Sequence, residues 1–103
     1  MRVIAKGTLK KFWEKYPEAE RPLLSWHKLI SESEWGNPAE LKRDINSASV
    51  VGNNRVVFNI KGNDYRLVTS IDFKFGLVFI IWIGTHKQYD KIDVKTIGYD
   101  KGN

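Results

Sequence analysis

The sequence contains no cysteine and no long apolar run, and each absence excludes a class of protein. Without cysteine the chain cannot form disulfides, a thiol nucleophile or a zinc ribbon. The longest apolar run extends from Leu77 to Ile83, well short of the roughly 20 residues that span a bilayer. The first residues are basic but lack the apolar core of a signal peptide. We therefore expect a cytoplasmic protein without a membrane segment.

The length and charge of the chain narrow the expectation further. A chain of 103 residues forms one domain, so residues 1–103 are predicted to fold together without a linker. Hydrophobic residues make up 42% of the chain and aromatic residues 13%, which argues against intrinsic disorder. Seventeen Lys and Arg against twelve Asp and Glu give a formal net charge of +5. That charge suits an anionic partner such as nucleic acid, although many proteins of similar charge bind none.

Apolar spacing in the first half of the chain predicts helices. One helix ends at Pro17, and its apolar stripe consists of Leu9, Phe12, Trp13 and Tyr16. A second helix is expected from just beyond Pro17 to Gly36, with a buried face of Ala19, Leu23, Trp26, Leu29, Ile30 and Ser33. Asn37 and Pro38 have the composition of an N-cap and a first-turn proline, which predicts a short third helix through Arg43.

From residue 50 the apolar period changes from 3.6 to 2, which predicts strands. Three strands are expected at Arg55–Ile60, Tyr65–Phe73 and Leu77–Ile83, with turns at residues 61–64 and 74–76. The last strand is apolar on both faces, so we expect it at the centre of the sheet. A short edge strand is expected at Arg2–Ala5. The fold class is therefore α+β, with N-terminal helices packed on a mostly antiparallel sheet.

Polar side chains follow the most buried predicted strand without a break, at residues 84–91. If the last two strands pair as a hairpin, facing residue numbers sum to 149 or 150, and Arg66 lies opposite residue 83 or 84. This pairing gathers cations, an imidazole and a phenol from distant positions. The group consists of Lys61, Arg66, His86, Lys87, Tyr89 and Lys91.

This group of side chains fits metal-free cleavage of a ribose phosphate. The 2′-hydroxyl must lose a proton, the leaving 5′-oxygen must gain one, and the phosphorane needs positive charge. Imidazole exchanges protons near neutral pH, as His86 would here. Arg66 can grip phosphate oxygens, and Tyr89 can stack on an unpaired base or move a proton. With only His27 and His86 available, no metal site or cofactor is predicted.

Plainer interpretations of the same residues remain open at this point. His86 can simply cap a turn at the end of the strand. Arg66 can be an exposed strand residue that pairs with Asp64 or Asp72. His27 is interpreted as a helix-boundary residue without chemistry, and among the four tryptophans only Trp82 is a candidate surface for a ligand.

These segments resemble the HigB family of bacterial toxins, which belongs to the RelE/ParE-like superfamily of toxin–antitoxin systems. The likeness extends from the motif FWEKYP at residues 12–17 to Asp93. It is strongest in four blocks: NPAELK at 37–42, RVVFNIKGN at 55–63, YRL at 65–67 and GTHKQYDKID at 84–93. Several ordered blocks at matching separations are more specific than a single short motif.

The resemblance implies a compact RelE-like fold and a metal-independent mRNA endoribonuclease that acts on translating ribosomes. Its implied partners are mRNA, the ribosome and a HigA-type helix-turn-helix antitoxin, through which alone the complex contacts DNA. By motif match, catalytic or phosphate-binding roles fall on the group of side chains described above. The candidate catalytic residues are Arg66, His86, Tyr89 and Lys61, and the candidate RNA-binding residues are Lys87, Lys91, Thr85 and Arg55.

Two positions depart from the family pattern. Ile81 and Ser70 stand where members often carry a basic residue, and Ser70 shares the predicted face of Arg66. Loss of these cations could weaken phosphorane stabilisation, narrow the range of targets or mark a toxin of reduced activity. An alternative function is a non-catalytic RelE/ParE-like binding module that poisons gyrase or docks an antitoxin, because one fold hosts both classes.

Overall fold

The structure, a computed structural model, describes residues 1–98 and has helices and strands in the predicted order. Its elements are β1 (Arg2–Ile4), α1 (Lys6–Lys15), η1 (Pro17–Ala19), α2 (Glu20–Ser31), α3 (Pro38–Asp44), β2 (Ser49–Val51), β3 (Arg55–Ile60), β4 (Tyr65–Asp72), β5 (Leu77–Thr85) and α4 (His86–Tyr89). The predicted α+β class is confirmed. No helix within the described residues has the length and apolar character needed to cross a membrane.

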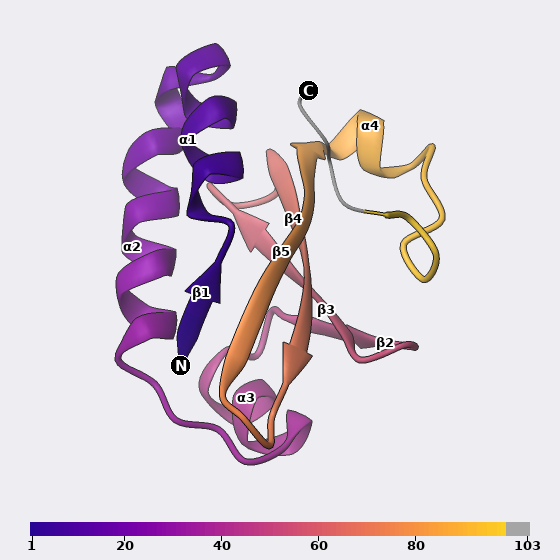
Figure 1. The fold of residues 1–103 in the computed structure, drawn as a ribbon. Helices are drawn as coiled ribbons and strands as arrows, with labels where there is room; N and C mark the ends of the chain where they lie inside the picture. The colour runs from indigo at the N-terminus through magenta and orange to yellow at the C-terminus, as the bar shows by residue number, and fades with distance from the viewer. Residues whose placement is uncertain (99–103) are drawn as a thin grey trace.

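The five strands form one sheet in the order β1-β5-β4-β3-β2 (Figure 1). Strand β1 pairs parallel with β5, and the remaining neighbours pair antiparallel. The mostly antiparallel sheet is therefore as predicted, whereas β4 rather than β5 is the middle strand, and β5 lies between β4 and the short edge strand β1. Strand β2 was not predicted, because three residues are too few to establish an alternating pattern.

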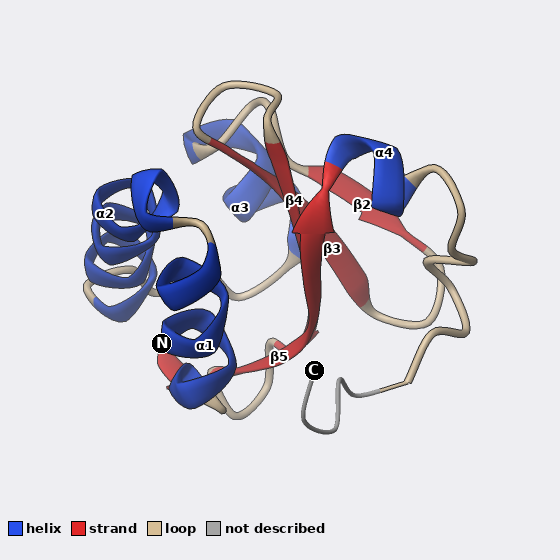
Figure 2. Cartoon of the chain, turned by 90° about the horizontal axis from the view of Figure 1, so that it is seen from above, coloured by secondary structure: helices blue, strands red, loops and turns tan. Residues whose placement is uncertain are grey.

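Each face of the sheet is covered by a different part of the chain, with α1 and α2 on one side and α4 on the other (Figure 2). The helix side carries the larger core, which includes Leu9, Leu23 and Phe58. On the opposite side Val57, Val68 and Ile81 form a second core, against which residues 89–97 place apolar side chains. The alternation of β3 produces this division, since Val56 and Phe58 face the first core while Val57 faces the second.

The hairpin of β4 and β5 has the predicted register and one irregularity. Arg66 lies opposite Gly84, and the pairing shifts by one residue between Val68 and Thr69. Ile81 is the extra residue, because Val68 faces Trp82 and Thr69 faces Ile80. Facing numbers therefore sum to 150 before the bulge and to 149 beyond it.

The end of α2 and the segment after β5 differ from prediction. Helix α2 ends at Ser31 rather than near Gly36, and Leu29 is 48% exposed instead of buried. The chain leaves the helix early because Trp35 is drawn into the first core, where its indole N–H donates to Asp44 (2.9 Å). The predicted cap of α3 is confirmed, since the Asn37 side chain accepts from the backbone N–H of Glu40 (3.0 Å).

Candidate active site

Arg66 and Tyr89 lie together on the second-core side of the sheet, as the register of β4 and β5 predicted. The Arg66 guanidinium carbon is 5.8 Å from the centre of the Tyr89 ring, a cation–π distance. Its Nη1 donates to the carbonyl oxygen of Asn63 (3.1 Å). The interpretation that Arg66 pairs with Asp64 or Asp72 is wrong, since neither carboxylate forms an ion pair with it within residues 1–98.

The short helix α4 carries Tyr89 and begins directly where β5 ends. Thr85 is its N-cap: the hydroxyl accepts from the backbone N–H of Gln88 (3.2 Å), and the Gln88 side chain accepts from the backbone N–H of Thr85 (2.9 Å). These reciprocal bonds are a capping box. The Thr-x-x-Gln spacing that signals it is visible in the sequence, yet α4 was not predicted. The cap fixes His86 and Tyr89 on a rigid strand end.

Asp64 connects the turn between β3 and β4 to the start of α4. Its carboxylate forms an ion pair with Lys61 (3.0 Å), and its carbonyl accepts from the backbone N–H of His86 (3.1 Å). Lys61 has a left-handed backbone (φ 52°), which is strained for a residue with a side chain. These contacts bring Lys61 and His86, which are distant in sequence, to the same end of the sheet.

The His86 ring is half-exposed and lies beside one acidic group. Its Nε2 is 3.7 Å from Asp90 Oδ1, one helical turn along the chain. The turn is capped by Thr85, and the ring of His86 takes no part in that cap. The Asp90 carboxylate is close enough to orient the ring. No group of three or more His, Asp or Glu side chains within the described part of the chain is arranged to hold a metal ion.

Trp82 and Gly84 form the floor next to Tyr89. The rings of Trp82 and Tyr89 are 6.3 Å apart with a tilt of 46°. A Cβ atom on Gly84 would lie 2.4 Å from the Trp82 ring and 2.7 Å from the side-chain oxygen of Gln88. Glycine is thus required at this position for the indole to lie across the strand. Trp82 is partly exposed and remains a candidate surface for a ligand.

Three of the candidate RNA-binding residues lie outside this group. Arg55 faces Ser70, four positions along β4 from Arg66 and so roughly 13 Å away. Its guanidinium donates to the carbonyl of Val94 (2.9 Å), so it holds the chain that covers the second core. Lys87 is exposed on α4, and Lys91 lies beyond it, toward α1.

The two departures from the family pattern lie on the second-core side of the sheet. Ile81 is 2% exposed and packs against Val57 and Val68 in the second core. Ser70 faces Arg55 and Phe79 across the sheet. Ile81 is therefore buried, whereas Ser70 lies four positions along β4 from Arg66 and so roughly 13 Å away.

A contact between Tyr65 and Glu18 supports the site from the helix side of the sheet, and no sequence signal pointed to it. The Tyr65 hydroxyl donates to the Glu18 carboxylate, which connects η1 to the start of β4. Burial, followed by the bond to Glu18, raises the pKa of Tyr65 to about 12. The same bond is the main cause that lowers the pKa of Glu18.

Comparisons with known proteins identify relatives that align over most of the chain. A model of the HigB toxin family, the RelE-like toxic component of a toxin–antitoxin system, matches residues 19–92. The mRNA interferase toxin HigB of Escherichia coli K12 is 30% identical over 92 residues, which cover 87% of this chain and 88% of that protein. The mRNA interferase HigB of Shigella flexneri matches equally, and that of Escherichia coli O6:H1 is 27% identical over 94 residues, 89% of this chain and 91% of the relative.

The family model spans most of the chain, and the relatives align over nearly their whole length. The chain belongs to the HigB family of toxins, the RelE-like toxic components of toxin–antitoxin systems.

Proposed function

We propose that this toxin is an mRNA endoribonuclease whose active site is formed by Arg66, His86, Tyr89 and Lys61. The observation that carries the proposal is the contact between the Arg66 guanidinium and the Tyr89 ring (5.8 Å) at the start of α4. Arg66 provides a cation for phosphate, and Tyr89 provides a face for an unpaired base. The names of the curated relatives, mRNA interferases, support the same activity.

The reaction that suits these groups is attack of a ribose 2′-oxygen on the adjacent phosphorus. The bond from phosphorus to the 5′-oxygen breaks, which leaves a 2′,3′-cyclic phosphate and a 5′-hydroxyl. His86 transfers a proton at one of the two oxygens, and Asp90, 3.7 Å from its Nε2, orients the ring. Arg66 and Lys61 neutralise the phosphorane, so the proposed reaction is metal-independent. Thr85 and Lys87 are proposed to contact flanking phosphates.

The proposed setting is the ribosome in the cytoplasm, where this toxin cleaves translated mRNA. A HigA-type helix-turn-helix antitoxin is the proposed neutralising partner, because the family is one half of a toxin–antitoxin pair. A small helix-turn-helix reading frame next to the toxin gene would support this part of the proposal, and its absence would argue against it. We also propose that residues 1–103 form a single RelE-like toxin domain.

The test combines growth with the mapping of RNA ends. Expression of the wild type is expected to stop growth and to create new 5′ ends in transcripts. Arg66→Ala and His86→Ala are expected to abolish both effects, whereas Arg43→Ala, an exposed α3 residue far from the site, leaves them unchanged. Circular dichroism melts confirm that each variant folds.

Other outcomes separate the alternatives. Intact transcripts beside damaged DNA would favour the gyrase-poisoning module over the nuclease. Full toxicity of folded Arg66→Ala and His86→Ala variants would refute the assignment of the site. Cleavage of purified mRNA with and without ribosomes, each with and without EDTA, tests ribosome dependence and metal independence separately.

A further inference from the structure

A groove of about 390 Å³ lies next to the candidate active site, between α1 and the end of β5. Ligand sites in proteins commonly measure roughly 300–1,000 Å³. The groove follows from the sheet topology, because β1 pairs only with Leu77–Phe79. Within residues 1–98, the rest of that edge of β5 has no neighbouring strand, and α1 runs beside it instead (Figure 1).

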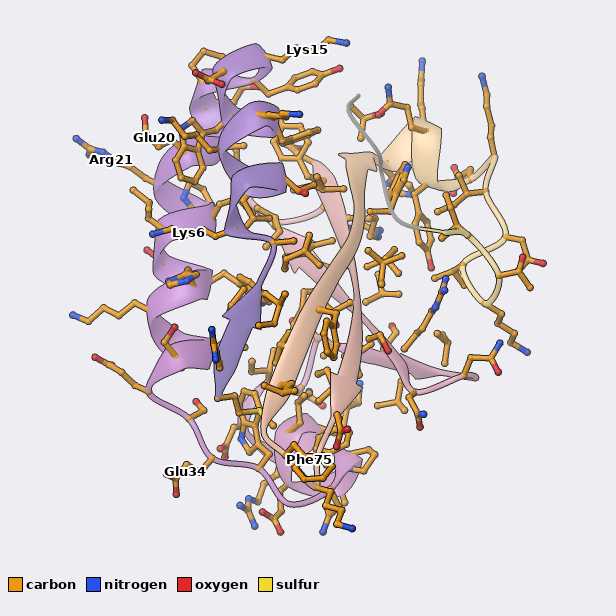
Figure 3. The ribbon with its side chains drawn as sticks, in the orientation of Figure 1. Lys6, Lys15, Glu20, Arg21, Glu34 and Phe75 are labelled. Carbon is orange, nitrogen blue, oxygen red and sulfur yellow. The ribbon has the colours of Figure 1, made fainter. Side chains whose placement is uncertain are left out.

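Both walls of the groove carry cations. Lys11 and Lys15 come from α1, where a spacing of four residues places them on one face, and Lys91 comes from the wall beyond α4. None of the three forms an ion pair with another described residue. In Figure 3, Lys15 extends from the upper end of α1 toward the α4 side, whereas Lys6 extends away from it.

Aromatic side chains connect the groove to the candidate active site. Tyr16 and Trp82 line it, and Trp82 also contacts the Tyr89 ring (6.3 Å). Tyr89 in turn lies beside Arg66. A strand of nucleotides that reaches Arg66 can therefore continue across Trp82 into the groove.

Lysines interleaved with aromatic rings are the combination that binds single-stranded nucleic acid, since cations follow the phosphates and bases stack on the rings. An acidic peptide could pair with the cations but has no bases to stack on the aromatic rings. The composition of the groove therefore favours RNA over a segment of an antitoxin.

We propose that this groove binds the nucleotides that flank the cleaved bond, with phosphates on Lys11 and Lys15 and a base against Tyr16 or Trp82. The proposal rests on the proposed ribonuclease function and extends its substrate site from the sheet end to α1. It assigns a role in substrate binding to a helix face that carries none of the candidate catalytic residues.

The test measures binding of a fluorescent single-stranded 2′-O-methyl RNA, which lacks the free 2′-hydroxyl and cannot be cleaved. Anisotropy is followed for the wild type and the Lys11→Gln/Lys15→Gln variant between 50 and 200 mM salt, a range chosen to expose phosphate contacts. Each phosphate contact on a single strand contributes about −0.7 to the slope of log affinity against log salt. The double variant is therefore expected to bind with a slope less steep by about 1.4.

The matched control is Lys6→Gln/Lys10→Gln, which removes the same charge from the same helix outside the groove. This control is expected to keep the wild-type slope within about 0.3, less than half of one phosphate contact. If the wild type cleaves mRNA but Lys11→Gln/Lys15→Gln keeps the wild-type slope, the groove does not bind RNA. The proposed ribonuclease function would still stand in that case. Absence of mRNA cleavage by the wild type would instead overturn the proposed function.

Two further outcomes also decide against the groove as an RNA site. One is the absence of any binding of the oligonucleotide to the wild type. The other concerns a poly-glutamate peptide that binds the wild type. If Lys11→Gln/Lys15→Gln abolishes binding of this peptide and leaves the affinity for RNA unchanged, the groove belongs to an acidic protein partner.

Discussion

Asp64 shows how one residue can hold two remote parts of a site together. Its side chain forms an ion pair with Lys61, and its carbonyl accepts from the backbone N–H of the first residue of α4. Tyr65, the next residue, contacts Glu18 on the other side of the sheet. The start of β4 is therefore fixed on both faces, and Arg66 projects from a rigid position.

The contact between Tyr65 and Glu18 predicts a specific loss of stability at alkaline pH. An ordinary tyrosine has a pKa near 10, whereas Tyr65 in the folded protein has a pKa of about 12. The unfolded chain binds fewer protons than the native state between these values, so this contribution is complete below pH 10 and is lost as the pH rises toward 12.

The Tyr65→Phe variant is expected to be less stable than the wild type at pH 8, and this difference should shrink as the pH rises through that window. Urea unfolding at several pH values measures it. Tyr16→Phe removes a phenol from the same aromatic cluster without touching Glu18, so its difference from the wild type should not follow that course. A constant difference for Tyr65→Phe at all pH values would contradict the assigned contact.

The sequence predicted the position of a residue when its partner lies in the same hairpin, and did not do so when the partner lies in a distant segment. Arg66 was predicted opposite residue 83 or 84 and faces Gly84, because a hairpin register follows from the turn that closes it. Arg55 was grouped with the RNA-binding residues, yet it donates to Val94. The path of residues 90–97 over the sheet depends on long-range packing and leaves no periodic signal.

At the scale of elements, α4 is the shortest α-helix within the described residues and the one on which the site depends most. Four residues form too little internal hydrogen bonding to be stable alone, so the capping box and the end of β5 must hold the helix. The strands β3 and β4 were predictable because alternation is repeated over six and eight residues, and β5 because its apolar run is continuous. Helix α4 was missed because its residues are polar and its stability comes from its cap.

Two helix caps allow stability and activity to be separated. Thr85→Ala and Asn37→Ala each remove a side-chain cap and are each expected to cost about 1 kcal/mol of unfolding free energy. Only Thr85→Ala is expected to reduce RNA cleavage, by roughly 10- to 100-fold, because it displaces His86 and Tyr89.

Thr85→Ser keeps the hydroxyl and should restore cleavage. Thermal melts and cleavage of mRNA are measured on the same preparations. Equal cleavage by Thr85→Ala and Asn37→Ala would show that the cap of α4 does not position the site.

The whole molecule consists of a sheet with a core on each face, and the smaller core determines which substitutions the site tolerates. Residues 89–97 complete that core and place Tyr89 beside Arg66. A basic residue is therefore tolerated in the second core only where its side chain remains exposed to solvent.

Ile81→Lys and Ser70→Lys test this explanation of the two departures from the family pattern. Ile81 is 2% exposed, so a lysine there should cost roughly 2–4 kcal/mol of unfolding free energy. Ser70 is only partly buried, and Ser70→Lys should cost less than about 1 kcal/mol. Urea unfolding of both variants gives the comparison, and similar costs for the two would argue against a closed second core.

The bulge at Ile81 determines which side chains of β5 face the site. A strand assigns side chains to its two faces by odd and even position, and one extra residue reverses that assignment for everything that follows. Trp82 and Gly84 share the face of Arg66 only because of this reversal. When this chain is aligned with another toxin, a gap placed one residue to the wrong side of Ile81 would exchange Trp82 for Ile83, and would turn a floor of the site into part of the core.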